Sequence, residues 1–184
     1  RIYDTFGEQS LEVLDRDPTR IEEVSGISQK KRDQFCDAYM ETRSARKLIN
    51  MLAPFDISAM QAIHLRRQLG LDAQTLLAQF PYMVFERDLI DFETADRLAQ
   101  ANGIPMDAPE RLDAGLLCTL KQAESSGHLS MHKERFVQRA VNLLRAPAVT
   151  WKAVAQRAFE MLKDNRLAIY RDHVYRPIIA QAEN

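Results

Sequence analysis

The chain has 184 residues, of which 46% are hydrophobic and 28% charged, a composition that is ordinary for a globular protein and excludes fibrous and disordered classes. No apolar run approaches the roughly 18 residues of a membrane span, no signal-peptide pattern is present, and Cys36 and Cys118 form no CxxC pair, so we expect a cytoplasmic protein with reduced thiols and no membrane role. The net charge of −1 is unevenly spread, because residues 1–103 carry 13 Lys or Arg against 17 Asp or Glu, whereas residues 104–184 carry 12 against 9.

Helix is predicted for most of the chain, because Ala, Leu, Arg, Gln and Glu dominate and only six glycines and seven prolines interrupt them. One turn pattern repeats in residues 1–103: an isoleucine follows an anchor residue, a small residue stands six positions after two of the anchors, and an apolar residue stands nine positions after all three. The three sets are Gly26, Ile27 and Phe35; Asp56, Ile57, Ala62 and Leu65; and Leu89, Ile90, Ala95 and Leu98. This spacing predicts three helix-turn-helix units in this region.

Each predicted turn can present backbone N–H groups to an anion. The isoleucine fills the gap between two helices, and the next residue, which is Ser28, Ser58 or Asp91, is suited to cap the following helix. The N-terminus of that helix favours a phosphate, and a glycine in the turn lets the phosphate approach the backbone closely. The predicted DNA-binding residues of this region are Gly26, Ile27, Ser28, Lys30, Lys31 and Ser58. Turns that serve packing alone are the alternative.

The second half of the chain has a different pattern, which begins after a proline-containing connector at residues 103–111. Helices are predicted at about 111–125 and 133–144, with a short extended piece at 127–131 between them, and Thr150 is suited to cap a third helix that runs to about Asn165. Two short strands flank a turn at Arg171 and Asp172. This order is typical of a winged-helix domain, which we assign to residues 104–184, and the hairpin region to residues 1–103.

The third helix of this domain has an apolar and a polar face. The predicted inner residues are Val154, Ala155, Ala158, Phe159 and Leu162, and the predicted outer residues are Lys152, Gln156, Arg157 and Lys163. In a DNA-binding winged helix, the outer face lies along phosphates and the wing contacts the backbone. The predicted DNA contacts are Lys152, Gln156, Arg157 and Arg171, with His173 beside them in the wing. Trp151 and Tyr170 are assigned to the core rather than to base stacking, and packing against the parent protein is the alternative for the whole domain.

The first turns resemble the helix-hairpin-helix DNA-binding motif, and the chain as a whole resembles the helix-hairpin-helix region of RecD/TraA-type DNA helicases, which are similar to the exodeoxyribonuclease V alpha subunit. The stretches that carry this resemblance are "IYDTFGEQSLEVLDRDPTRIEEVSGISQKK", "LAPFDIS", "FPYMVF", "DFETADRLAQANGIP", "RLDAGLLCTL" and "SGHLSM". They lie between Ile2 and Met131, and only the first turn keeps its glycine. The resemblance implies a fragment that begins at Arg1 and ends, after "YRPIIAQAEN", before the helicase motor domains.

Catalytic signatures are absent from the sequence. No glycine begins a GxxxxGK[ST] loop, so this fragment is predicted not to hydrolyse ATP, and ATP with magnesium is expected only for the intact helicase that the resemblance implies. His128 and His132 lie four residues apart without a HExxH pattern or a third ligand, so no metal site is predicted. The glycine- and proline-rich loop with an aspartate that base-excision glycosylases need does not follow Gly26.

The resemblance implies a non-catalytic region that binds DNA and holds the strand junction ahead of the motor domains of the same chain, through phosphate contacts without sequence preference. The intact protein is then expected to be an ATP-dependent 5′ to 3′ helicase in repair, recombination or conjugation. The alternative is a protein-interaction or domain-spacing module whose hairpins have lost their glycines and do not bind DNA. A free-standing winged-helix regulator is a third hypothesis.

Overall fold

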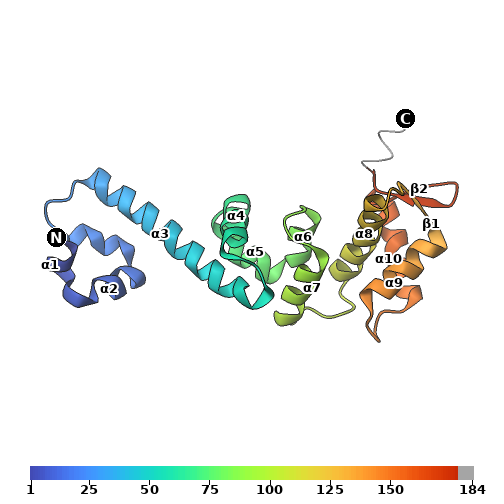
Figure 1. Cartoon of the computed structure of the whole chain (residues 1–184), viewed down its shortest axis with the longest axis horizontal. Coiled ribbons are helices and arrows are strands. Elements are labelled where there is room, and N and C mark those ends of the chain that lie inside the picture. Colours follow the sequence, from blue (N-terminus) through green and yellow to red (C-terminus); the bar gives the residue numbers. More distant parts are fainter. Residues whose placement is uncertain (178–184) are drawn as a thin grey trace. The chain divides into compact units, whose positions relative to one another are not determined.

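The computed structural model describes residues 1–177 and is mainly helical, with one small antiparallel sheet (Figure 1). The chain divides into two compact units, of which the first ends at Gln74 and the second begins at Thr75. This division lies inside the predicted hairpin region, and a functional boundary at residue 103 stays a prediction. The predicted connection to a motor falls mostly in residues 178–184, outside the described part of the chain. No helix in the described part is long and apolar enough to cross a membrane.

The N-terminal unit is built around the long helix α3, Gln29–Leu52. Its other helices are α1 (Ile2–Phe6), α2 (Ser10–Arg16) and α4 (Ala59–Leu69), with the start of α5 (Ala73–Gln79). Short 3₁₀ turns connect them at Gly7–Gln9, Pro18–Glu23, Ala53–Phe55 and Gly70–Asp72. The two predicted turns of this region therefore lie directly before α3 and directly before α4.

A small apolar cluster holds the first turn in place. Leu14, Ile21 and Val24 are buried, and Ile27 and Phe35 pack against them. The predicted role of the turn isoleucine is therefore confirmed in the first turn. The predicted inner face of the second unit is also confirmed, because Ala62 and Leu65 are buried on α4.

The C-terminal unit contains the predicted alternation of helices and short strands. Its elements are α6 (Pro81–Glu86), α7 (Phe92–Ala101), α8 (Pro109–Ser125), β1 (Met131–His132), α9 (Lys133–Leu144), α10 (Trp151–Lys163), β2 (Ala168–Tyr170) and β3 (His173–Tyr175). The sequence predicted this order from α8 onward. The expected cap of α10 is also present, because the Thr150 side chain accepts a hydrogen bond of 3.1 Å from the Ala153 N–H.

The sheet has the strand order β1-β3-β2, and both pairings are antiparallel. Val174 on β3 pairs with Met131 on one side and with Ile169 on the other. Both Val174 and Met131 are buried in the main core cluster of the unit. The sheet therefore adds its central strand to the core while β2 forms the outer edge of the hairpin.

Helix α8 is the central element of the C-terminal unit, and it contacts α6, α7, α9 and α10 (Figure 1). It is buried on more than one face, since Leu112, Ala114, Leu116 and Leu120 are all nearly inaccessible to solvent. A helix whose buried residues lie on several faces is an interior helix. The predicted hairpin segment before α8 and the predicted winged segment after it are therefore packed on the same helix.

Gly115 marks a close approach of α8 to Leu144 at the end of α9. A Cβ atom at this position would lie 2.6 Å from Leu144 Cδ2 and 2.8 Å from Leu144 Cγ. Leu144 is itself buried, so its side chain has little room to move.

We expect Gly115→Ala to lower the free energy of unfolding by about 1 kcal/mol, because overpacking outweighs the gain in helix propensity. Chemical denaturation of Gly115→Ala, Leu144→Ala and the double variant would measure this. The double variant should cost less than the sum of the two single variants, because the shortened Leu144 makes room for the new methyl group. A Gly115→Ala protein that is more stable than the parent would show that helix propensity alone decides the effect.

Candidate nucleic-acid interface

The first turn has the backbone conformation for which glycine is suited. Gly26 has a φ of 76°, and Ser28 is the N-cap residue of α3. A Cβ at Gly26 would lie 3.4 Å from the Arg1 guanidinium, whose Nη1 donates a 2.8 Å hydrogen bond to the Gly26 carbonyl oxygen. The positive φ is the reason why a side chain at this position would be strained.

The N-terminus of α3 is capped differently from the prediction. The Ser28 side chain makes no capping hydrogen bond, so the expected side-chain cap is wrong, although the residue does occupy the N-cap position. The Lys31 and Arg32 N–H groups both return to the Ser28 carbonyl oxygen, at 2.9 and 3.0 Å. Lys30 and Lys31 are exposed beside this helix end. The arrangement leaves a helix N-terminus without a side-chain cap next to two cations, which favours an anion.

In the second turn, side chains of the protein cap the N-terminus of the helix that follows. Asp56 adopts the left-handed conformation, with a φ of 62°. Ser58 caps α4 in a reciprocal capping box: its Oγ accepts a bond of 3.2 Å from the Gln61 N–H, and Gln61 Oε1 accepts a bond of 2.9 Å from the Ser58 N–H. The predicted DNA-binding residue Ser58 therefore holds the helix end with its own side chain.

The third turn differs from the predicted alignment by one residue. The left-handed residue is Asp88, with a φ of 59°, and not the anchor Leu89. Asp91 is the N-cap of α7 as expected, and its Oδ1 accepts a 2.7 Å bond from the Thr94 N–H. Ala95 and Leu98 are buried as the spacing predicted. The extra residue lies between the left-handed position and the isoleucine, where a pattern aligned on the isoleucine does not detect it.

The outer face of α10 is only partly as predicted. Lys152, Gln156 and Lys163 are exposed. Arg157 is not directed outward, because its Nε and Nη2 donate to the two carboxylate oxygens of buried Asp113, with a distance of 2.8 Å from Nη2 to Oδ2. The expectation that Arg157 faces solvent is therefore wrong: a buried carboxylate on α8 attracts it inward.

The aromatic residues of this region also differ from the prediction. Phe159, which was assigned to the inner face of α10, is exposed, and its place in the core is taken by Met161, which the sequence analysis missed. Trp151 and Tyr170 are exposed as well, so their assignment to the core is wrong. No sequence signal separates them from core residues, because aromatic side chains at helical or strand spacing usually indicate a core.

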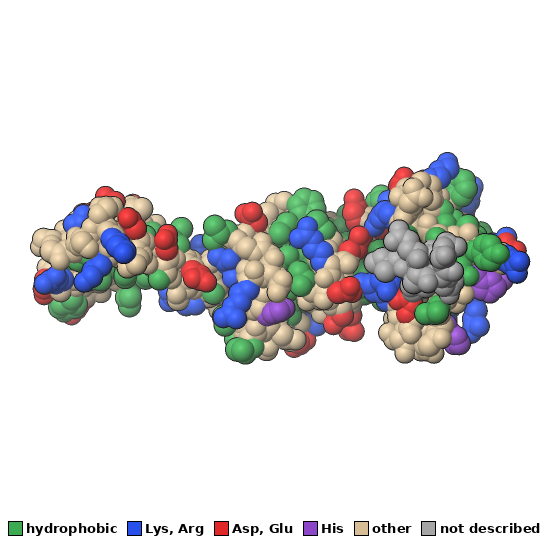
Figure 2. All heavy atoms as spheres, turned by 90° about the horizontal axis from the view of Figure 1, so that it is seen from above, with side chains coloured by type: hydrophobic (Ala, Val, Ile, Leu, Met, Phe, Trp, Pro, Cys, Tyr) green, Lys and Arg blue, Asp and Glu red, His purple; other side chains and the backbone are tan. Residues whose placement is uncertain are grey.

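The turn between β2 and β3 places charged groups at its tip. Arg171 and Asp172 both have positive φ values, of 46° and 66°. Lys133 Nζ lies 2.7 Å from Asp172 Oδ1, while the Arg171 guanidinium is exposed and lies 5.2 Å from the centre of the Tyr170 ring. Figure 2 shows basic, histidine and apolar side chains close together at this end of the C-terminal unit. Arg171 therefore lies at the tip of the β2–β3 hairpin, and its contact with DNA stays a prediction.

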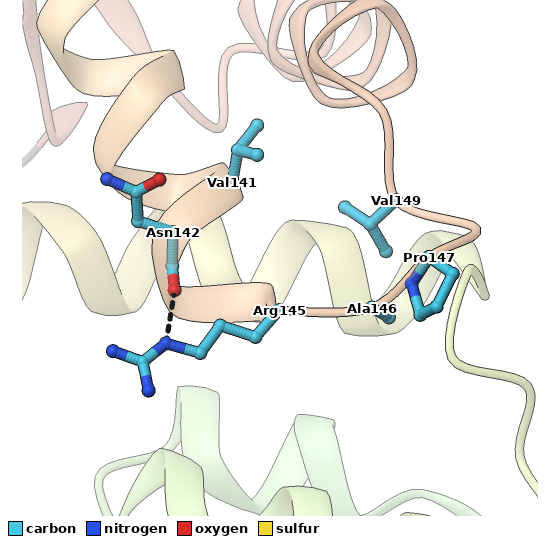
Figure 3. A pocket seen from close by; sticks show the side chains of 6 residues that line it. All are labelled: Val141, Asn142, Arg145, Ala146, Pro147 and Val149. Carbon is cyan, nitrogen blue, oxygen red and sulfur yellow. Dashed lines mark hydrogen bonds between the residues drawn. The ribbon is translucent and has the colours of Figure 1, made fainter.

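A hollow that the sequence does not predict lies at the turn between α9 and α10. Its volume is about 600 Å³, and Figure 3 shows Asn142, Arg145, Pro147 and Val149 around it. Arg145 has a positive φ of 34°, and its Nε donates a 3.0 Å bond to the Asn142 carbonyl oxygen. This bond fixes the guanidinium beside the hollow. The only sequence signal here is the break at "RAPAVT", which contains Arg145 but does not predict a hollow beside it.

Part of this chain is similar to known proteins. Residues 41–130 match the family described as the ATP-dependent RecD2 DNA helicase HHH domain, where HHH denotes helix-hairpin-helix. The chain is 27% identical over 162 residues to the ATP-dependent RecD2 DNA helicase of Deinococcus radiodurans. The match covers 88% of this chain and 23% of the relative, so the chain spans about a quarter of the relative's length. The family match contains the second and third turns and α8, whereas Gly26 and the two lysines after it lie before its first residue.

Proposed function

Because this chain contains a helix-hairpin-helix region of the RecD helicase type, we propose that it is a non-catalytic region that binds and positions DNA for a RecD/TraA-like helicase. The observation that carries the proposal is the family match across residues 41–130, in which two hairpin turns each lead into a helix N-terminus. Such turns present N–H groups to phosphates, which are the same in every DNA sequence. Binding is therefore proposed to be independent of sequence.

Tandem hairpins followed by a winged helix are part of the same proposal. The order of helices and strands from α8 to β3 and the strand order β1-β3-β2 support a winged helix. Lys152, Gln156 and Arg171 are exposed, which supports their proposed contacts with phosphates. The intact protein is proposed to be a cytoplasmic 5′ to 3′ helicase of repair, recombination or conjugation, whose motor domains use ATP and magnesium and follow this region at the strand junction.

The first turn is proposed to make the strongest phosphate contact of the three turns. The N-terminus of α3 has no side-chain cap and two exposed lysines, whereas Ser58 and Asp91 occupy the corresponding helix ends with their own side chains. The carboxylate of Asp91 also repels an anion at close range. The first turn, whose helix N-terminus has no side-chain cap, therefore supports phosphate binding more than the second and third turns do.

Changing both lysines of this turn should weaken DNA binding and its dependence on salt. We expect the double variant Lys30→Ala, Lys31→Ala to bind forked DNA about tenfold more weakly and to reduce the slope of log affinity against log salt by about two, since two phosphate contacts are lost. Fluorescence anisotropy across a salt series measures both quantities. Lys47→Ala is the matched control, because Lys47 is an exposed lysine of the same helix, far from its N-terminus. A double variant with the parent's affinity and slope would exclude the first turn from the interface.

The second candidate function is a protein-interaction or domain-spacing module. The observation that favours it is the side-chain capping of α4 and α7, because both helix ends are satisfied without a ligand. A parent chain that shows no affinity for forked DNA at low salt would favour this candidate over the DNA-binding one.

A further inference from the structure

Three large apolar side chains are exposed along one groove of the C-terminal unit. Trp151 is 49% exposed, Phe159 52% and Ile169 48%. Together with the buried side chains of Phe136 and Val137, they line a groove of about 290 Å³ between α9, α10 and the β2–β3 hairpin. Trp151 and Phe159 are eight residues apart on α10, so they lie on the same face of that helix. Exposed aromatic side chains that line one groove indicate a binding surface.

The charges around the groove indicate what kind of partner it fits. Lys152 and Lys163 are exposed on α10, and no carboxylate of residues 1–177 forms an ion pair with either of them. Lys163 Nζ lies 4.5 Å from the centre of the Phe159 ring. Of the two charged residues that line the groove, Lys133 forms an ion pair with Asp172, and Glu134 Oε2 lies 2.5 Å from His132 Nδ1. Lys152 and Lys163 therefore place two positive charges beside the aromatic rings, and these complement a partner that carries flat apolar groups and negative charges.

We propose that this groove, named here the α10 groove, binds unpaired bases of single-stranded DNA. One base stacks on Trp151 and a second base of the same strand stacks on Phe159, while Lys152 and Lys163 contact phosphates of that strand. The inference rests on the proposed DNA-binding function and adds that this face binds the single-stranded form of DNA. Base stacking on aromatic side chains tolerates any sequence, because every base has a flat apolar face.

Duplex DNA does not meet the requirements of the α10 groove. Its bases are stacked on one another and present only their edges, so an aromatic ring cannot stack on them without unstacking the helix. Single-stranded DNA offers free base faces at no such cost. The hairpin turns, in contrast, need only phosphates, which both forms of DNA provide.

Trp151 provides the readout, because it is the single tryptophan of the chain. The full chain is titrated with an oligothymidylate and with an abasic oligonucleotide of the same length, and both tryptophan fluorescence and the anisotropy of a labelled oligonucleotide are followed. We expect the oligothymidylate to quench Trp151 and to bind roughly tenfold more tightly than the abasic strand. Phe159→Ala should remove most of that difference. Phe80→Ala is the matched control, because Phe80 is also 52% exposed but does not line the groove, and it should retain the parent's preference.

Each of the other outcomes overturns the proposal for the α10 groove, and one of them also overturns the proposed DNA-binding function. Equal affinity for the two oligonucleotides, unchanged in Phe159→Ala, would overturn base stacking in the α10 groove and leave the phosphate contacts of the proposed function intact. Binding of neither oligonucleotide nor of forked DNA would overturn both. Quenching by an acidic peptide that contains aromatic residues, without quenching by oligothymidylate, would overturn the proposal in favour of a protein partner.

Discussion

Replacing Arg111 by methionine is expected to lower the free energy of unfolding by about 3 kcal/mol, because it leaves the largely buried carboxylate of Asp96 without its cation. The Arg111 side chain is 3% exposed and that of Asp96 is 14% exposed. Arg111 Nε and Nη2 donate to the two oxygens of Asp96 at 2.6 and 3.0 Å. Its remaining donors reach the carbonyl oxygens of Met106 at 2.9 Å and Leu144 at 2.8 Å. The residue therefore joins α8 to α7, to the connector before α8 and to the end of α9.

The effect of Arg111→Met should depend on pH. Burial acts to raise the pKa of Asp96, but hydrogen bonds from Arg111 and Tyr82 more than offset it, so the pKa of Asp96 is lowered in the folded protein. A carboxylate with a lowered folded pKa stabilises the fold above its unfolded pKa of about 3.9, and this contribution is lost as the pH falls through the folded pKa. In Arg111→Met the burial remains without the cation, so protonation relieves the unpaired charge. The difference in stability between parent and variant should narrow from about pH 7 to about pH 4.

Urea denaturation at several pH values measures both effects. Arg139→Met is the matched control, because Arg139 is an exposed arginine on α9, and its replacement should change stability by less than about 0.5 kcal/mol. An Arg111→Met protein as stable as the Arg139→Met protein would contradict the buried ion pair. A stability difference between the parent and Arg111→Met that does not vary with pH would contradict only the role of Asp96.

The repeating features of the fold could be predicted from the sequence. Thr150 before an apolar periodic run predicted the start of α10, and the residues around Arg171 predicted the hairpin. The spacing from Ile57 and Ile90 predicted the buried faces of α4 and α7. These features depend on local spacing and capping, which act over one or two helical turns. Local rules were therefore sufficient for these features and for the order of the elements from α8 onward.

The features that long-range contacts decide could not be predicted in the same way. Arg111 and Asp113 stand in a helix where charged residues are usually exposed, and only the burial of α8 on several sides turns them into internal ion pairs. The position of Arg157 follows from Asp113, which is 44 residues away in the sequence. Phe159 is exposed because no element of the described chain covers that part of α10. Of the candidate site, the sequence predicted the turns and the exposed Lys152 but not the groove.

Asp113 is the second residue whose replacement should have a large effect. Its side chain is 3% exposed and accepts hydrogen bonds from Arg157 on α10 and from Arg166 just before β2. Arg166 Nη2 also lies 2.7 Å from Glu86 Oε1 on α6, and Arg157 Nη1 lies 2.7 Å from Glu160 Oε2. One carboxylate on α8 therefore holds two arginines that would otherwise repel each other. Without the Asp113 carboxylate, only the carboxylates of Glu86 and Glu160, which are more exposed, remain to compensate the charges of the two arginines.

We expect Asp113→Ala to lower the free energy of unfolding by about 3 kcal/mol or more, measured by urea denaturation. Asp107→Ala, which changes an exposed aspartate just before α8, is the matched control and should have little effect. The double variant Asp113→Ala, Arg157→Ala should cost less than the sum of its two single variants, since removing one guanidinium relieves part of the repulsion. Additive costs would mean that Arg157 does not depend on Asp113 and faces solvent as its helical spacing predicted. The cycle thus decides whether Arg157 is available to DNA or is committed to the packing of α10 on α8.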